Sequence, residues 1–170
     1  NTAIAAALSL IPIGQPLLIG TGAVLTSAAV VLFTPKKANA ESADFYYNRG
    51  IDKHDAGDYY GAISEYSKAI EINPRDVNAY TKRCNSKLSI KDYKGSIDDC
   101  SKAIEINPSN ADAYYNGGIA KYELKDYSGA IADYSKAIEI NPTDAMAYVN
   151  RAVVKKTSGD NQGACADARK

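Results

Sequence analysis

The nine-residue string Tyr-Ser-Lys-Ala-Ile-Glu-Ile-Asn-Pro covers residues 66–74 and recurs unchanged at residues 134–142. A third copy, at residues 100–108, differs only in its first residue, Cys100. The copies begin at residues 66, 100 and 134, so the spacing is 34 residues in both intervals. A fixed period of this length is typical of stacked repeats, in which each unit packs on its neighbours and no single globular core forms.

The period defines three full units, 43–76, 77–110 and 111–144, and a shorter one, 145–170. Two positions of each unit hold small residues and another holds tyrosine. These are Gly50, Cys84, Gly118 and Ala152 at the eighth position, Ala62, Ser96, Ala130 and Ala164 at the twentieth, and Tyr46, Tyr80, Tyr114 and Tyr148 at the fourth. Small side chains where two helices meet permit the close approach of an antiparallel pair.

Each unit contains two stretches with apolar residues at helical spacing, which predicts an all-α fold. Asp58 and its equivalents precede the second stretch and suit a helix N-cap. Asn-Pro at residues 73–74 and its equivalents end that stretch, because the residue before proline is pushed out of the α region. We expect helices at residues 43–56, 59–72, 77–90, 93–106, 111–124, 127–140 and 145–157, and an eighth that starts near Asn161.

This set of positions resembles the tetratricopeptide repeat (TPR) family over residues 43–170. The resemblance implies a right-handed α-solenoid of helical hairpins, with the first helices of successive units lining a concave groove. The seventh position departs from the family, which usually has Leu there, and holds Arg49, Arg83, Gly117 and Arg151. We therefore expect a TPR domain over residues 41–170, preceded by an apolar segment over residues 1–40.

The resemblance places certain first-helix positions in the groove, where they would bind a partner peptide or helix. The candidate binding residues are Asn48, Lys82, Asn116 and Asn150 at the sixth position, together with Tyr47, Tyr115 and Tyr122. An asparagine amide both donates and accepts, so it can pair with the backbone of an extended peptide, and tyrosine adds flat apolar area. The alternative that these residues recur for structural reasons stays open. The cations with which some TPR domains clamp a chaperone C-terminus are missing at the equivalent positions.

The distribution of charge argues against other classes of protein. The 20 basic and 20 acidic residues are interspersed, unlike the basic footprint of a nucleic-acid-binding protein. Neither a phosphate-binding glycine loop nor a nucleophile elbow occurs. We expect no enzyme activity, cofactor, small-molecule substrate or metal site, and we expect the single His54 to be solvated. We also expect Glu65 and Asp98-Asp99 to lie on the solvated surface.

Three cysteines, Cys84, Cys100 and Cys165, stand at positions that normally hold small or apolar residues, without Cys-x-x-Cys spacing. We expect them to be buried and to pack as small hydrophobic residues. Cys84 and Cys100 occupy facing positions of one hairpin, so a disulfide between them is the alternative for an exported domain.

The first 35 residues carry no charge and form two apolar runs, 3–13 and 17–33. Seventeen helical residues reach roughly 25 Å, which is marginal for crossing a bilayer. We favour a membrane anchor with the repeats on the cytoplasmic side, because Lys36 and Lys37 follow the second run. Ala38-Asn39-Ala40 also resembles a signal-peptidase site, so cleavage after Ala40 followed by export is one alternative. A buried apolar hairpin packed on the repeats is another.

Together these features predict a protein–protein interaction module, membrane-anchored or exported, that binds a partner peptide or helix in its concave groove. The alternative is a structural packing subunit, or an assembly factor of a membrane complex, without a separable peptide ligand. A groove ligand would contact the sixth-position asparagines, whereas a packing subunit would bury the convex face.

Overall fold

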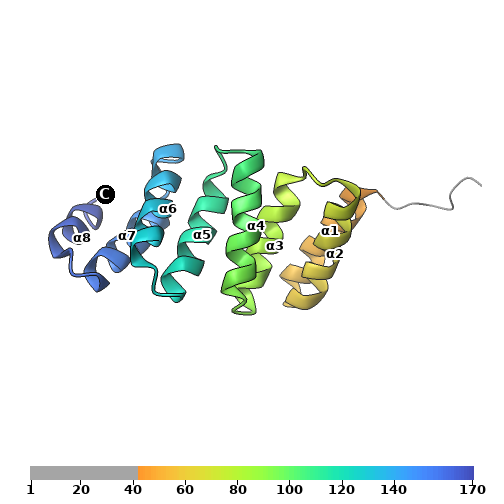
Figure 1. Cartoon of the computed structure of the whole chain (residues 1–170), viewed down its shortest axis with the longest axis horizontal. Helices are drawn as coiled ribbons and strands as arrows, with labels where there is room; N and C mark the ends of the chain where they lie inside the picture. Colours follow the sequence, from red (N-terminus) through yellow and green to blue (C-terminus); the bar gives the residue numbers. More distant parts are fainter. Residues whose placement is uncertain (1–41) are drawn as a thin grey trace, which may run out of the picture. The chain divides into compact units, whose positions relative to one another are not determined.

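The computed structural model describes residues 42–170, which form a row of antiparallel helix pairs (Figure 1). The helices are α1 (Ala43–Asp55), α2 (Tyr59–Ile72), α3 (Val77–Ser89), α4 (Tyr93–Ile106), α5 (Ala111–Glu123), α6 (Tyr127–Ile140), α7 (Ala145–Thr157) and α8 (Asn161–Asp167). No strand occurs among these described residues. Each pair packs on the next, as expected for an all-α repeat fold.

Every helix is preceded by an N-cap residue whose side chain accepts a hydrogen bond from a backbone amide of the first turn. Asp58 Oδ1 accepts from the Gly61 amide at 2.9 Å, and Asp92 repeats this contact with Gly95 at 3.0 Å. The side-chain caps are Ser42, Asp58, Asp76, Asp92, Asn110, Asp126, Asp144 and Asp160. These bonds satisfy amide groups that the helix itself leaves unpaired, and the predicted caps are confirmed.

The second helices end where the Asn-Pro pairs predicted. Asn73 has φ −125° and ψ 89°, outside the α region, and Asn107 and Asn141 adopt nearly the same conformation. The proline that follows each asparagine excludes the α conformation at the residue before it. The chain therefore turns at the same place in each full unit and starts the next first helix four residues after the asparagine.

The two helices of a pair come together through one repeated contact between the eighth and twenty-fourth positions. Tyr66 of α2 is fully buried and packs on Gly50 of α1, and Tyr134 of α6 packs on Gly118 of α5. A Cβ atom at Gly118 would lie 2.8 Å from Tyr134 Cε1, too close for any other residue without a shift. Glycine at these two positions is therefore required by the tyrosine ring.

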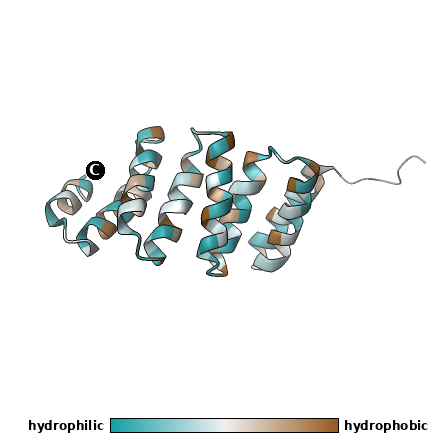
Figure 2. Ribbon diagram, viewed as in Figure 1, coloured by the Kyte–Doolittle hydropathy of each residue, from teal (hydrophilic) through white to brown (hydrophobic). Residues whose placement is uncertain are grey.

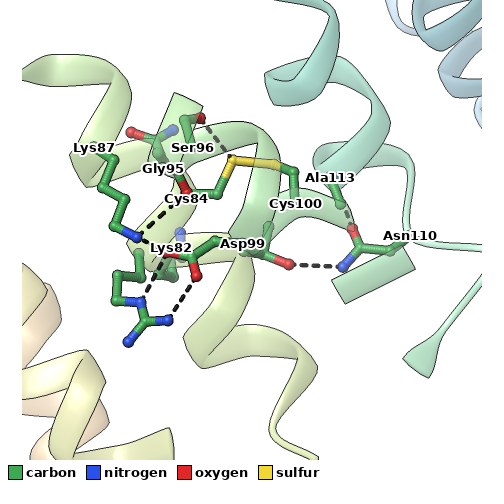
Figure 3. Close-up of a disulfide and its surroundings, with 12 residues drawn as sticks. Lys82, Cys84, Lys87, Gly95, Ser96, Asp99, Cys100, Asn110 and Ala113 are labelled. Atoms are coloured by element: carbon green, nitrogen blue, oxygen red, sulfur yellow. Dashed lines mark hydrogen bonds and ion pairs between the residues drawn. A yellow bond between two sulfur atoms is a disulfide. The ribbon is translucent and has the colours of Figure 1, made fainter. Parts of the chain in front are cut away.

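In the second unit a disulfide replaces this glycine–tyrosine contact. Cys84 of α3 and Cys100 of α4 occupy the same two positions, their Cα atoms are 5.5 Å apart, and their sulfurs are bonded (Figure 3). Both cysteines are buried, as expected, but they form the disulfide that was the alternative to free buried thiols, because the eighth and twenty-fourth positions face each other at disulfide distance. The expectation of burial is wrong for Cys165, which is a free but exposed cysteine.

Reduction of the disulfide is expected to lower the free energy of unfolding by about 3 kcal/mol, because the bond closes a short loop of the unfolded chain. Urea denaturation with and without dithiothreitol measures the difference. Cys84→Ser should reproduce the loss without reductant, whereas Cys165→Ser serves as the matched control and should leave stability unchanged. Identical transitions with and without dithiothreitol would contradict the expectation.

Hydrophilic residues occur along every helix, with apolar residues among them (Figure 2). Within the described part of the chain, no helix combines the length and the apolar character needed to cross a bilayer. The expected membrane or signal segment, residues 1–40, lies outside the described residues.

Candidate functional site

The first helices of the units form one face of the array, which we call the first-helix face. Neighbouring first helices contact each other along it, α1 with α3 and α3 with α5. One hollow on this face, the polar hollow, lies between α3 and α5. It is lined by Thr81, Lys82, Asn85, Asp112, Tyr115 and Asn116. Three of the predicted binding residues, Lys82, Tyr115 and Asn116, are therefore brought together.

The amide of Asn116 has an unusual environment in this hollow. The residue is only 6% exposed, yet no group within residues 42–170 forms a hydrogen bond with its side chain. The amide atoms of Asn116 are not among the fully buried polar atoms that lack a partner, so they reach solvent in the hollow. Lys82 and Asp112 add one charge of each sign to the same hollow. The hollow thus presents donors and acceptors that fit a polar, extended ligand.

A second hollow, the mixed hollow, lies between α5 and α7. Its lining consists of Ile119, Tyr122, Glu123, Tyr134, Asn150, Val153 and Val154. Predicted residues Tyr122 and Asn150 meet here. Asn150 Nδ2 donates to the Tyr115 hydroxyl at 2.9 Å, and this bond connects the two hollows. The sequence did not indicate Tyr134 or Val154 as lining residues, because both positions belong to the buried contacts between helices.

The two remaining predicted residues, Tyr47 and Asn48 of α1, line neither hollow. Asn48 is exposed, whereas the Tyr47 ring lies 5.9 Å from that of Tyr66 and packs on the core. Tyr115 packs in the same way on Tyr134, with 5.8 Å between ring centroids. Burial raises the pKa of both Tyr47 and Tyr115 above its ordinary value. The fifth-position tyrosines therefore have a structural role as well as a place beside the binding face.

A repeated ion-pair cluster, absent from the sequence prediction, lies between the second helices and the first helices. Arg83 donates through Nε and Nη2 to the Asp99 carboxylate at 2.8 and 2.6 Å. Lys87 Nζ lies 2.8 Å from Asp99 Oδ2 (Figure 3). Glu65 and Asp99 are each 4% exposed. Their predicted place on the solvated surface is wrong. Arg83 and Lys87 of α3 compensate for the burial of Asp99, whereas Glu65 pairs with Arg49 of α1 and Lys68 of its own helix and keeps Oε2 without a partner among the residues that the structure describes.

The spacing of the ion pairs was a signal that could have revealed them. In three units an arginine at the seventh position precedes an acidic residue by 16 positions, as in Arg49 with Glu65, Arg83 with Asp99, and Arg151 with Asp167. The seventh and twenty-third positions face each other across each helix pair. An acidic residue that recurs 16 positions after an arginine is therefore predicted to form a buried ion pair, whereas its charge alone would predict a solvated position.

His54 is partly buried and its Nδ1 lies 2.8 Å from Ser86 Oγ, so it is tied to α3 and not simply solvated. Its ring also packs edge-on against Tyr59. No group of three or more potential metal ligands occurs among residues 42–170.

Comparisons with known proteins address the family. Residues 43–76 match the model described as a tetratricopeptide repeat, and residues 85–125 and 118–159 match a TPR repeat model. A comparison with curated proteins found no match.

Several solved structures share the arrangement of the helices. A crystal structure of MamA has a TM-score of 0.74 and 25% identity, covering 78% of this chain and 78% of that chain. The TPR domain of Arabidopsis OM64 has a TM-score of 0.68 and 25% identity, over 68% of this chain and 96% of its own. The first TPR domain of Spaghetti (RPAP3), bound to an HSP90 peptide, has a TM-score of 0.68 and 23% identity, over 71% and 95%. The repeat matches and the helical arrangement show that this chain belongs to the tetratricopeptide repeat family.

Proposed function

We propose that the chain is a protein–protein interaction module, a right-handed solenoid that binds an extended peptide or helix of a partner protein on its first-helix face. Binding, not catalysis, is the role that its residues support. The first TPR domain of RPAP3, similar in fold, was solved with an HSP90 peptide, which supports this mode of binding. We expect the ligand to differ from a chaperone C-terminus, because the set of residues at the equivalent clamp positions does not supply the cations of that clamp. In the first three units these positions hold Tyr47, Ile51, Lys82, Asp112 and Asn116.

The observation that carries the proposal is the amide of Asn116, which lines the polar hollow and forms no hydrogen bond with any group of residues 42–170. A peptide backbone offers one donor and one acceptor per residue, which an asparagine amide can match. Lys82 and Asp112 stand on either side of the hollow to orient the polar ligand. The mixed hollow next to it offers apolar area from Ile119 and Val153 for a side chain of the same ligand.

Replacing Asn116 and Asn150 by alanine is expected to weaken peptide binding by roughly tenfold or more, since each 1.4 kcal/mol corresponds to one decade. Asn116 should carry the larger share, because Asn150 already donates to Tyr115. A random peptide library selected on the immobilised 170-residue chain supplies the ligand. Titration calorimetry of an enriched peptide then compares wild type with the double variant.

The matched control is Lys136→Ala on the exposed surface of α6, which should change affinity little because surface charges contribute below about 1 kcal/mol. If the enriched peptide binds the double variant as tightly as wild type, the asparagine-based groove is wrong. A library without any enriched peptide would favour the packing-subunit alternative.

We further propose that residues 17–33 hold the module at a membrane, with the repeats on the cytoplasmic side. The uncharged run followed by Lys36 and Lys37 supports this topology. The chain is expected to remain in the membrane fraction after carbonate extraction, whereas a variant that lacks residues 1–40 should be released. N-terminal sequencing of the mature protein provides the opposing result: a start at Glu41 would establish cleavage and export.

A further inference from the structure

Two of the four units contain the same arginine site, built from groups of three helices. Arg83 donates to Asp99 through Nε and Nη2 at 2.8 and 2.6 Å, and through Nη1 to Ser67 Oγ of the preceding unit at 2.9 Å. Its guanidinium also lies 5.6 Å from the centre of the Tyr80 ring. A carboxylate that accepts two hydrogen bonds, a hydroxyl that accepts a third and an aromatic ring face together suit a guanidinium group.

The fourth unit repeats these distances. Arg151 donates to Asp167 at 2.8 and 2.6 Å and to Ser135 at 2.9 Å, and its guanidinium lies 5.6 Å from the Tyr148 ring centre. A lysine completes both sites, Lys87 in the second unit and Lys155 in the fourth. The helical repeat therefore places the same acceptor groups at the same relative positions in different units.

The third unit has the acceptors without the arginine. Its equivalents are Ser101, Tyr114, Gly117, Lys121 and Asp133, which we call the incomplete site. Glycine occupies the arginine position, and the only cation that contacts Asp133 within the described residues is Lys121, at 2.6 Å. A Cβ atom at Gly117 would lie 2.9 Å from Asp133 Oδ2, so the seventh and twenty-third positions face each other in this unit as well.

The missing arginine leaves the acceptors of this unit more accessible. The Asp133 side chain is 13% exposed, against 5% for Asp99 and 6% for Asp167. Ser101 is exposed, whereas Ser67 and Ser135 are partly covered by the arginines. Burial raises the pKa of Asp133, and Lys121 does not reverse the shift. Burial also raises the pKa of Asp167, but the hydrogen bonds from Arg151 and Lys155 outweigh it and leave that pKa below its ordinary value. Asp133 thus lacks the second cation that its equivalent has.

We propose that the incomplete site binds an arginine side chain of a partner protein, which supplies from outside the guanidinium that Arg83 and Arg151 supply within the chain. The guanidinium would fork onto the Asp133 carboxylate, donate to Ser101 Oγ and stack on Tyr114. Charge complementarity and the two internal copies select arginine over lysine, because only a planar guanidinium can meet all three groups together. This surface is separate from the hollows of the first-helix face.

The test titrates the peptide acetyl-Gly-Arg-Gly-amide into the ¹⁵N-labelled 170-residue chain and follows backbone amide shifts. Saturable shifts are expected at Ser101, Gly117 and Asp133. The same peptide with citrulline in place of arginine keeps the shape without the charge, and one with lysine keeps the charge without the fork. Both should bind at least about tenfold more weakly.

Gly117→Arg is the decisive variant, because it restores the side chain that the other units carry and fills the site internally. It should remain folded and lose the saturable shifts. Asp133→Asn should lose them as well, while Asp98→Asn, an exposed carboxylate nearby in the array, should retain them. The proposal is overturned if the arginine peptide gives no saturable shifts at these residues, if citrulline or lysine binds equally well, or if Gly117→Arg leaves the shifts unchanged.

Discussion

Replacing Tyr134 by alanine is expected to lower the free energy of unfolding by about 4 kcal/mol. Tyr134 is 2% exposed, and its ring fills the space over Gly118 between α5 and α6. The ring also packs near Tyr115 and belongs to a cluster with Val154 of the next unit. The truncation therefore leaves a cavity that touches both the contact between α5 and α6 and the interface with the fourth unit. Urea denaturation followed by far-UV circular dichroism measures the loss.

The matched control is Tyr60→Ala, which removes the same side chain from a helix position that is 74% exposed. Its effect should stay within about 0.5 kcal/mol, so the difference between the two variants isolates packing from helix propensity. Tyr134→Phe keeps the ring and should retain most of the stability. Equal losses for Tyr134→Ala and Tyr60→Ala would show that the ring is not a core element.

The sequence predicted the helices well because the signals that set their ends are local. The predicted starts agree with the observed ones, since each follows a capping side chain such as Asp58. Predicted ends at residues 56, 90 and 124 lie one residue beyond the observed ends, because Ala56, Ile90 and Leu124 are the C-caps. Because each unit packs only on its neighbours, the repeat also predicts that successive helix pairs pack in the same way.

Contacts between helices were predicted less well, because they depend on pairs of positions. Cys100 stands where two other units have tyrosine, and only its position opposite Cys84 turns a small apolar residue into half of a disulfide. Asp99 was expected at the surface because carboxylates are seldom buried without a partner. Its partner, Arg83, lies 16 residues earlier on another helix, so the pair is revealed only by comparing this spacing between units and not by a local pattern.

The binding face likewise depends on contacts between neighbouring units. First-helix positions were enough to predict that Lys82, Tyr115 and Asn116 lie together. The sequence could not show that Asn150 already donates to Tyr115 while Asn116 has no partner among the described residues, because both asparagines occupy the sixth position. Which amide is available to a ligand is decided by side-chain contacts between neighbouring units.

Replacing Asp99 by alanine is expected to lower the free energy of unfolding by about 3 kcal/mol, measured by urea denaturation with the disulfide intact. The change leaves Arg83 and Lys87, whose side chains are 17% and 18% exposed, close together without their shared carboxylate. Asp98→Ala is the matched control, since the neighbouring carboxylate is exposed and should contribute less than about 0.5 kcal/mol. Losses of the same size in both variants would contradict a role for the buried pair.

The cation of the pair should matter less than the carboxylate. Arg83→Ala leaves Asp99 paired with Lys87, which is the arrangement that the third unit has naturally, with Gly117 beside Asp133 and Lys121. We expect Arg83→Ala to lower the free energy of unfolding by about 1 kcal/mol, well below the loss for Asp99→Ala. Removing the arginine leaves the carboxylate with one cation, whereas removing the carboxylate leaves both cations without a partner. The opposite order, with Arg83→Ala the more damaging variant, would mean that the arginine stabilises the array mainly through its packing on Tyr80 and Ser67.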